Sequence, residues 1–357
     1  MTTRDRMLGS AVVVLWGLNF LAIRAGLDHF PALFFAALRF AVLAIPVLIF
    51  VPRPRVPLRW LLLYGIGFGI LQFAFLFTAM RTGMPTGLAS LVLQTSAPFT
   101  VVLGALLLRE RLRPRQLIGL AVASAGIAVI GADRMGEAAL LPMLLTLAGG
   151  FGWALGNIGS RLATTATPGS EPPVNPLSLT LWMTVIPPVP LFVLSAMTEG
   201  PATGLRALTD LAAPTGPAAL LGLAYLVTLG TVGGSGLWTY LMSRYPAGTV
   251  APLSLLVPVV GIAAAWLVLD ETPTAAQLVG AAVVIAGAFV TVSASASPPG
   301  MRRPARPEAR GDESTEGMGE IARVTAVPGS VADSATPGGC DPVIGVGGRG
   351  SRRGRVG

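Results

Sequence analysis

The feature that most constrains the fold of this chain is a succession of long apolar segments joined by short loops. A lipid bilayer needs about 20 consecutive apolar residues per helix. Ten segments meet that length: 8–27, 31–51, 60–80, 85–108, 114–132, 139–160, 175–197, 217–241, 246–269 and 274–295. Only 12% of the residues are charged, whereas soluble domains carry about 25%. We therefore predict an all-α integral membrane protein with ten transmembrane helices.

The chain also contains an internal duplication. A shift of 161 residues places Tyr64 on Tyr225, and the match continues without a gap over 64–126. Each copy holds five of the predicted spans. Because five is odd, the two copies would cross the membrane in opposite directions, as the inverted repeats of secondary transporters do. We expect a first repeat at 7–132 and a second at 139–295.

The distribution of arginine sets the expected orientation. All 25 basic residues are Arg. They gather at the N-terminus and in alternate loops: Arg4 and Arg6, then Arg53, Arg55 and Arg59, then Arg109, Arg111, Arg113 and Arg115. Cytoplasmic loops carry the excess of basic residues, so both termini are expected in the cytoplasm and the protein in the cell inner (plasma) membrane. Residues 297–357, rich in Arg, Gly and Pro, are expected to form a disordered cytoplasmic tail.

The residue types that are absent exclude several classes of protein. The sequence has no Lys, which the phosphate-binding loop of an ATPase and a Schiff-base enzyme both require. His29 and Cys340 are its single His and Cys, too few for a metal cage without carboxylate help. We expect neither an enzyme nor a cofactor, metal or nucleic-acid partner. The expected partners are a small-molecule substrate and the lipid bilayer, with monomer and homodimer both open.

Arg39 lies well inside the second predicted span. An Arg at a helix centre costs roughly 2.5–3.5 kcal/mol on insertion scales, so it needs an acceptor. Asp28, across the short turn, is the nearest acidic residue; helix-end carbonyls and a substrate carboxylate are the alternatives. Arg39 either belongs to a buried pair that fixes the first two helices or contacts substrate directly. No Asp or Glu lies deep inside a predicted span, and Glu110 and Glu271 lie at helix ends, where capping is expected.

An aromatic and amide pattern occurs once in each half. The segment "VVVLWGLNFLAIRAG" contains Trp16 and Asn19, and "GWALGNIGSRL" contains Trp153 and Asn157. These spacings of three and four residues put each pair on one helix face. Two interpretations stand: hydrogen bonds between helices, or the lining of a central cavity, to which Trp238 would add a third aromatic wall.

Further polar residues differ between the halves. Gln72 and Gln94 lie within the third and fourth spans, and the positions that correspond to them in the second copy are not polar. Such asymmetry is where substrate specificity is expected. Ser254 offers the second half a hydroxyl. Pro98 and Pro258 each remove a backbone hydrogen bond and predict interrupted helices, which either mark the transport site or are static kinks.

At this point the residues resemble a known family. The segments "PTGLASLVLQTSAPFTVVLGALLLRERLRPRQLIGLAVASAG" and "PLSLLVPVVGIAAAWLVLDETPTAAQLVGAAVVIAG" resemble the two EamA domains of the drug/metabolite transporter superfamily. "WGLNFLAIRAGL", "GNIGSR" and "VAPLSLLVPVVG" are similar to its O-acetylserine/cysteine exporter branch, over roughly 7–292. The resemblance implies export of small amino-acid metabolites by alternating access, or a broader drug, metabolite or amino-acid exporter of the same fold. Arg39 would then orient the substrate carboxylate, the amides and Ser254 would bind its polar end, and the Trp residues would line the cavity.

Overall fold

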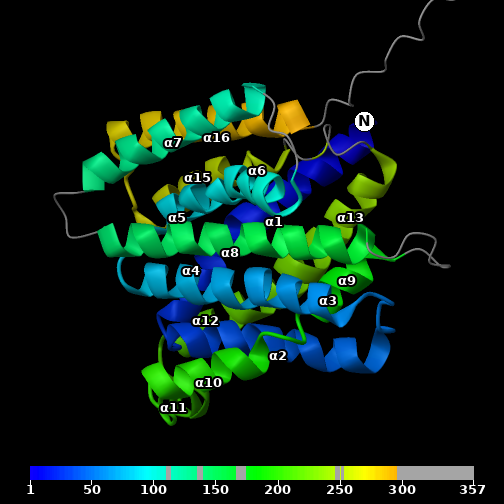
Figure 1. The fold of residues 1–357 in the computed structure, drawn as a ribbon. Coiled ribbons are helices and arrows are strands. Elements are labelled where there is room, and N and C mark those ends of the chain that lie inside the picture. Colours follow the sequence, from blue (N-terminus) through cyan, green and yellow to red (C-terminus); the bar gives the residue numbers. More distant parts are fainter. Residues whose placement is uncertain (110–113, 135–139, 166–173, 246–249, 251–252, 296–357) are drawn as a thin grey trace, which may run out of the picture. The chain divides into compact units, whose positions relative to one another are not determined.

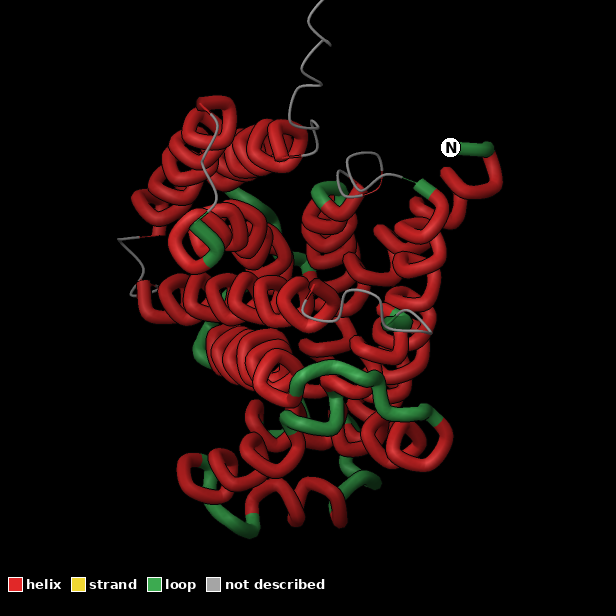
Figure 2. The backbone as a smooth tube through the Cα atoms, turned by 45° about the vertical axis from the view of Figure 1, so that its right-hand side comes forward, coloured by secondary structure: helices red, strands yellow, loops and turns green. Residues whose placement is uncertain are grey.

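The structure of the protein is a computed structural model that describes residues 1–295 except 110–113, 135–139, 166–173, 246–249 and 251–252. Every regular element in these ranges is a helix (Figures 1 and 2). The predicted tail at 297–357 and Glu110 lie outside the described residues.

In the described part of the chain, seven helical segments are long and apolar enough to cross a membrane. They are α1 (Thr3–Leu27), α2 (Ala32–Phe50), α3 to α4 (Leu58–Arg81), α5 to α6 (Thr86–Leu107), α8 (Leu140–Thr165), α9 to α10 (Pro176–Thr198) and α12 to α13 (Gly216–Arg244). Shorter apolar stretches lie in the other three predicted spans: Pro114–Ile130 in α7 (Pro114–Arg134), the whole of α15 (Val257–Leu269), and Ala275–Val290 in α16 (Ala275–Ser295). The chain is therefore an all-helical, multi-pass membrane protein.

Local sequence explains several helix starts. Pro31 and Pro85 immediately precede α2 and α5, where the fixed backbone angle of proline suits a helix entry. Helix α1 begins at Thr3, earlier than the predicted residue 8, because the side chain of Thr2 accepts a hydrogen bond from the N–H of Asp5 and caps it.

Two of the long segments contain a π-helix, which the sequence analysis did not predict. The first runs as α3 (Leu58–Tyr64), η1 (Gly65–Leu71) and α4 (Gln72–Arg81). The other runs as α12 (Gly216–Tyr225), η3 (Leu226–Gly233) and α13 (Gly234–Arg244). A shift of 161 residues places the first residue of η1 on the first residue of η3. The π-helix is rare in proteins, and where it occurs it is often part of a functional site.

Other segments are broken by tighter turns. Helix α5 (Thr86–Val92) passes through a 3₁₀ turn, η2 (Leu93–Thr95), into α6 (Ser96–Leu107). A turn at 255–256 precedes α15. Pro98 and Pro258 lie near the starts of α6 and α15, just after these interruptions. A break between α9 (Pro176–Met183) and α10 (Pro188–Thr198), and the short helix α11 (Thr203–Thr209), were not predicted.

The two halves exchange their first helices. Helix α1 packs against α12, α13 and α15 of the second half, and α8 packs against α3, α4 and α6 of the first. Helices α2 and α10 pack together, as do α7 and α16, which lie side by side in Figure 1. The approach of α8 to η1 is so close that a Cβ on Gly67 would collide with the backbone of Gly156. Helices α1 and α8 are therefore each surrounded mainly by helices of the other half.

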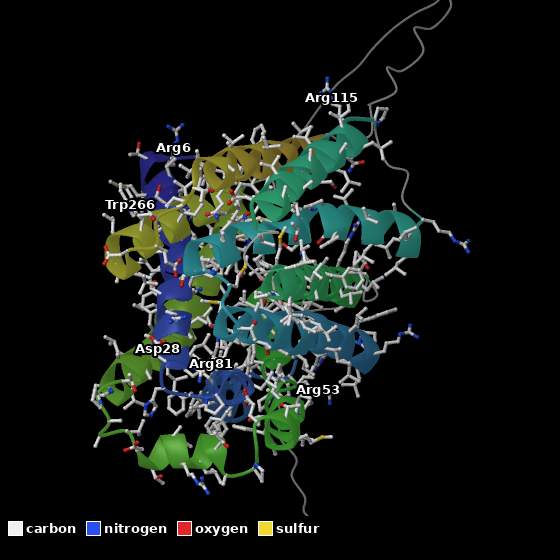
Figure 3. The ribbon with its side chains drawn as sticks, turned by 90° about the vertical axis from the view of Figure 1, so that its left-hand side faces the viewer. Arg6, Asp28, Arg53, Arg81, Arg115 and Trp266 are labelled. Carbon is white, nitrogen blue, oxygen red and sulfur yellow. The ribbon has the colours of Figure 1, made fainter. Side chains whose placement is uncertain are left out.

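The outward surfaces are strongly apolar. On α15, Trp266 is 55% exposed and Leu267 is 76% exposed; Figure 3 shows Trp266 pointing away from the helices. In the same view Arg6 and Asp28 lie at opposite ends of α1. Exposed apolar side chains of this size would be costly in water and are favourable against lipid chains.

Candidate functional site

Arg39 is buried between the two halves. It lies on α2 and is 6% exposed. Its Nη2 donates a hydrogen bond to Oγ1 of Thr231, in η3, at 3.1 Å. The guanidinium carbon lies 4.3 Å from the ring centroid of Phe73 and 5.4 Å from that of Phe40. Nε is buried without a hydrogen-bond partner. The charge is thus held by aromatic faces and one hydroxyl.

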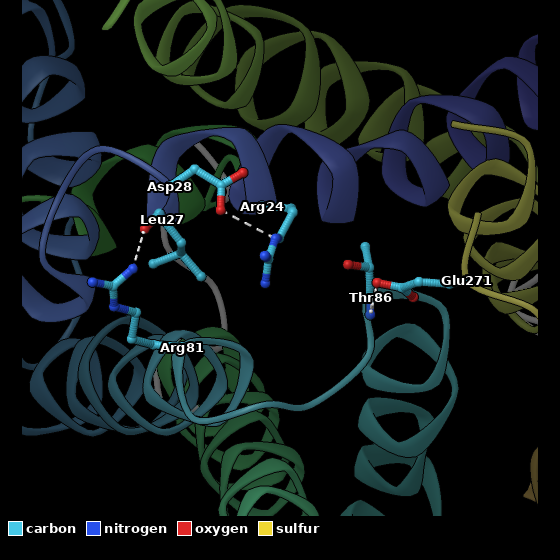
Figure 4. A network of polar contacts seen from close by, with 6 residues as sticks. All are labelled: Arg24, Leu27, Asp28, Arg81, Thr86 and Glu271. Atoms are coloured by element: carbon cyan, nitrogen blue, oxygen red, sulfur yellow. Dashed lines mark hydrogen bonds and ion pairs between the residues drawn. The ribbon is translucent and has the colours of Figure 1, made fainter. Parts of the chain in front are cut away.

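Asp28 is not the acceptor of Arg39. Its Oδ1 lies 3.2 Å from Nε of Arg24, one helical turn earlier in α1. Nearby, Nη1 of Arg81 donates to the carbonyl of Leu27 at 2.9 Å, and Figure 4 shows both contacts at the end of α1. The turn between α1 and α2 directs Asp28 back along its own helix, so Arg39 has no ion pair among the described residues. The interpretation as a buried pair that fixes the first two helices is therefore corrected.

The predicted pair on α1 packs against η3. Nε1 of Trp16 donates to the carbonyl of Gly230 at 3.2 Å. Asn19 lies against the same residue, so closely that a Cβ on Gly230 would collide with Asn19 Oδ1. This oxygen is buried and has no hydrogen-bond partner. The rings of Trp16 and Trp238 are 5.2 Å apart. Gly230 precedes Thr231, so α1 and Arg39 contact neighbouring residues of one π-helix.

Of the predicted pair on α8, Trp153 and Asn157, only Trp153 is connected to Arg39, through a series of aromatic rings. Trp153 meets Phe68 of η1 edge to face at 5.7 Å, and Phe68 meets Phe73 at 5.9 Å. Asn157 instead donates to Thr100 Oγ1 at 3.0 Å. The structure therefore brings the Trp side chain of this pair into contact with the group around Arg39, whereas the Asn side chain binds α6.

Gln94 joins the two interrupted helices. It lies in η2, and its Nε2 donates to the backbone carbonyl of Ser254 at 2.9 Å. Gln72 begins α4, directly after η1 and directly before Phe73, and is 3% exposed. Its Oε1 is buried and unpartnered. Buried amide oxygens without donors are rare in folded proteins and call for an explanation, such as a ligand or water.

Two glutamates cap the N-termini of helices that are far from them in the sequence. The carboxylate of Glu271 accepts hydrogen bonds from the N–H groups of Thr86 and Gly87, at 3.0 and 3.1 Å; Figure 4 shows Glu271 beside Thr86. Glu199 does the same for two N–H groups in the first turn of α2, at 2.9 and 3.1 Å. A carboxylate at a helix N-terminus satisfies free N–H groups and the helix dipole. Capping by Glu271 agrees with the expectation from sequence.

Two surface pockets lie beside these caps. One, of about 150 Å³, is bordered by Glu271 and Leu88. The other, of about 360 Å³, is bordered by His29, Arg81 and Glu199. Neither is lined by the predicted substrate-binding residues. Within the described ranges, no three His, Cys, Asp or Glu side chains gather as metal ligands would.

Sequence reasoning missed the residues that hold Arg39. Thr231 corresponds to Ile70 in the first copy, an asymmetry of the same kind that singled out Gln72. A comparison of the copies position by position would have found it. Phe73 and Phe68 gave no signal, because aromatic residues are common in any membrane helix.

Asp5 was also missed. It is 1% exposed, and its Oδ2 accepts hydrogen bonds from the hydroxyls of Tyr245, at 2.6 Å, and Thr2, at 2.7 Å. The spacing of Thr2 and Asp5 is that of a capping box, which would have moved the predicted start of α1. No sequence signal pointed to Tyr245.

Comparisons with known proteins place the chain among transporters. Residues 7–132 and 140–293 match the sequence profile of the "EamA-like transporter family". The chain is 45% identical over 294 residues to a "Probable amino-acid metabolite efflux pump" of Escherichia coli (strain K12), across 82% of this chain and 96% of that protein. A protein with the same description from Salmonella typhimurium (strain LT2) is also 45% identical, with the same coverage.

More distant proteins share the fold. A "Probable terminal-alkyne amino-acid exporter" of Streptantibioticus cattleyicolor is 29% identical over 285 residues, across 78% of this chain and 90% of that protein. One solved crystal structure is 21% identical and superposes with a TM-score of 0.53, covering 83% of this chain and 98% of the other. That similarity concerns the fold alone.

Proposed function

The chain belongs to the EamA-like transporter family, and on that premise we propose that it is a secondary transporter that exports small amino-acid metabolites, such as cysteine and O-acetylserine, across the inner membrane. The names of its 45% identical relatives support a substrate of this class. The observation that carries the proposal is Arg39, a buried cation that has no carboxylate partner in the described part of the chain. A substrate carboxylate would supply that partner.

The proposed topology has ten transmembrane helices in two inverted repeats, 7–132 and 139–295, with both termini in the cytoplasm. Two observations support it. The π-helices η1 and η3 occur at positions related by the duplication. The first helix of each half also packs against the third segment of the other half, which is the exchange expected from a two-fold relation between repeats.

In the proposed site, Arg39 binds the substrate carboxylate and the polar side chains bind the rest of the molecule. Two buried oxygens, Asn19 Oδ1 and Gln72 Oε1, have no donor in this conformation, and an ammonium group would supply one. The other proposed substrate-binding residues are Trp16, Gln94, Trp153, Asn157, Trp238 and Ser254. Among these residues, Trp16 contacts Trp238, and Gln94 donates a hydrogen bond to the backbone of Ser254.

Alternating access would come from one repeat rocking against the other. The interruptions before Pro98 and Pro258 are the proposed points of bending, because a helix without its backbone hydrogen bonds bends more easily. Gln94 connects these two points through Ser254.

A broader exporter of amino acids or of other drugs and metabolites is the alternative. The similarity to a "Probable terminal-alkyne amino-acid exporter" favours it. The two functions differ in their response to substrate size.

Uptake into everted membrane vesicles tests both. Vesicles with the protein should accumulate labelled cysteine and O-acetylserine above empty vesicles, and a series run with and without a proton gradient identifies the driving force. Competition by a panel of larger amino acids at similar concentrations would favour the broader exporter. No uptake above empty vesicles for any of these compounds would contradict export of amino-acid metabolites.

A further inference from the structure

Arg39 makes far fewer hydrogen bonds than it can. A guanidinium has five N–H donors, and here one of them reaches an acceptor, Thr231 Oγ1, in the part of the chain that the structure describes. Nε is buried without a partner. Donors that are shielded from water are left unpaired only at a cost. Arg39 therefore has unused donors for an acceptor that can bind several of them at once.

Thr231 is a poor substitute for that acceptor. Its hydroxyl already donates to the carbonyl of Leu226, five residues earlier in η3, at 2.7 Å. It then accepts from Arg39 at 3.1 Å. A carboxylate can bind a guanidinium through two parallel bonds with both partners charged, whereas Thr231 offers one bond to a neutral hydroxyl. A carboxylate that reached Arg39 would displace Thr231, whose own hydroxyl would keep its bond to Leu226.

We propose that Thr231 occupies the place of the substrate carboxylate on Arg39 and competes with it, so that Thr231 sets the affinity for carboxylate-bearing substrates and releases η3 when substrate binds. The inference rests on the proposed function only in taking Arg39 as the carboxylate receptor. It adds a residue that determines specificity and a link between substrate binding and one π-helix.

The contacts of η3 show which other helices would be affected if Thr231 were displaced from Arg39. Gly230, next to Thr231, receives the hydrogen bond of Trp16 and packs against Asn19. Loss of the hydrogen bond between Arg39 and Thr231 would therefore alter the packing of η3 against α1, which belongs to the other half of the chain. In η1 the corresponding residue is Ile70, which has no hydroxyl, so substrate binding would act on the two π-helices unequally.

Kinetics of two variants test the competition. Thr231→Val keeps the shape and removes the hydroxyl, whereas Thr231→Ser keeps the hydroxyl. Without its competitor, Arg39 should bind cysteine more tightly in Thr231→Val, with KM lower by about tenfold or more, the value of one hydrogen bond to a charged group. The maximal rate should fall with KM because release of substrate slows. Thr231→Ser should resemble the wild type. A merely structural Thr231 would leave KM unchanged or raise it in Thr231→Val, and either result overturns the proposal.

A binding measurement separates this inference from the proposed transport. The full chain, labelled with fluorotryptophan in lipid nanodiscs, gives a resonance for Trp16 that Trp16→Phe identifies. Cysteine should shift this resonance, and cysteinamide, which lacks the carboxylate, should not. A shift with cysteine but no vesicle uptake would contradict the transport function and leave the displacement intact. Equal shifts with both compounds, or none with saturating cysteine, would overturn the displacement.

Discussion

The side chain of Gln94 and the backbone of Ser254 connect the two interrupted helices of the protein. Nε2 of Gln94 donates to the carbonyl of Ser254 at 2.9 Å. Gln94 lies in the turn between α5 and α6, and Ser254 lies just before the turn that precedes α15. The duplication places Leu93 on Ser254, so the bond joins equivalent points of the two halves. In the proposed rocking of the repeats, this bond would couple the movements of the two turns.

Gln94→Ala should abolish this connection. It leaves the Ser254 carbonyl without its side-chain donor and frees the two turns to move separately, so we expect uptake into everted vesicles to fall by about tenfold or more while membrane insertion stays normal. Gln277→Ala is the matched control, because Gln277 is also buried but binds Asp133 at the α7–α16 contact, at 2.9 Å. Equal losses in the two variants would show that the effect is not specific to the turns.

Arg39→Met separates a structural role from a functional one. Methionine has a similar length and no charge, so it removes the cost of burying a cation, which is several kcal/mol per ion. We expect the midpoint of thermal unfolding in detergent to stay the same or rise, while transport of carboxylate substrates falls by at least about tenfold. A clear drop in the unfolding midpoint with transport retained would show that Arg39 stabilises the packing of the helices and does not bind substrate.

Gly230→Ala should be destabilising because of a single contact. The new Cβ would collide with Asn19 Oδ1, and overpacking of this kind costs about 1–3 kcal/mol. The double variant with Asn19→Ala should recover the unfolding midpoint, as coupled neighbours do, but not transport, because Asn19 would be lost. Gly236→Ala, which would meet nothing within 4 Å, should leave the midpoint unchanged. Independent effects of the two substitutions would contradict the packing.

Glu271→Gln should destabilise the N-terminus of α5. The two carboxylate oxygens accept from the N–H groups of Thr86 and Gly87, and an amide would place its own donor against one of them. Loss of such a cap costs about 0.5–2 kcal/mol, measurable as a lower unfolding midpoint. Asp270→Asn is the neighbouring control: Asp270 has a left-handed backbone with φ of 55°, which Asn tolerates. The contact would be unimportant if both variants unfolded alike.

The transmembrane elements were predictable because hydrocarbon demands long apolar helices, and those segments stand out in the sequence. The caps were partly predictable: a glutamate at a helix end suggested capping for Glu271, but not which helix it caps, since Thr86 is far away in the chain. The π-helices were not predictable. Glycines such as Gly67 and Gly230 allow η1 and η3 to lie close to α8 and α1, but a glycine-rich segment does not by itself specify a π-helix rather than an α-helix.

The candidate site was predictable only as a set of residue types. Unusual polar residues in apolar helices identified Arg39, Asn19 and Gln94, because their burial is costly wherever they lie. Their partners come from the other half of the chain, and the sequence did not show which side chains would meet. The expected acceptors of Arg39 were therefore Asp28, helix-end carbonyls or a substrate carboxylate, and the turn geometry directs Asp28 to Arg24 instead.

The bond between Asp5 and Tyr245 predicts an energetic coupling between the beginning of α1 and the end of α13. A hydroxyl that donates to a carboxylate forms a charge-assisted hydrogen bond, which is stronger than a neutral one, and here the two oxygens lie 2.6 Å apart. Asp5→Asn and Tyr245→Phe should each lower the unfolding midpoint, and the double variant should lose less than the two together. Tyr240→Phe is the control, because the Tyr240 ring contacts Arg244 and its hydroxyl has no hydrogen-bond partner within the described residues. Full additivity of the two substitutions would mean that the bond does not hold α1 to α13.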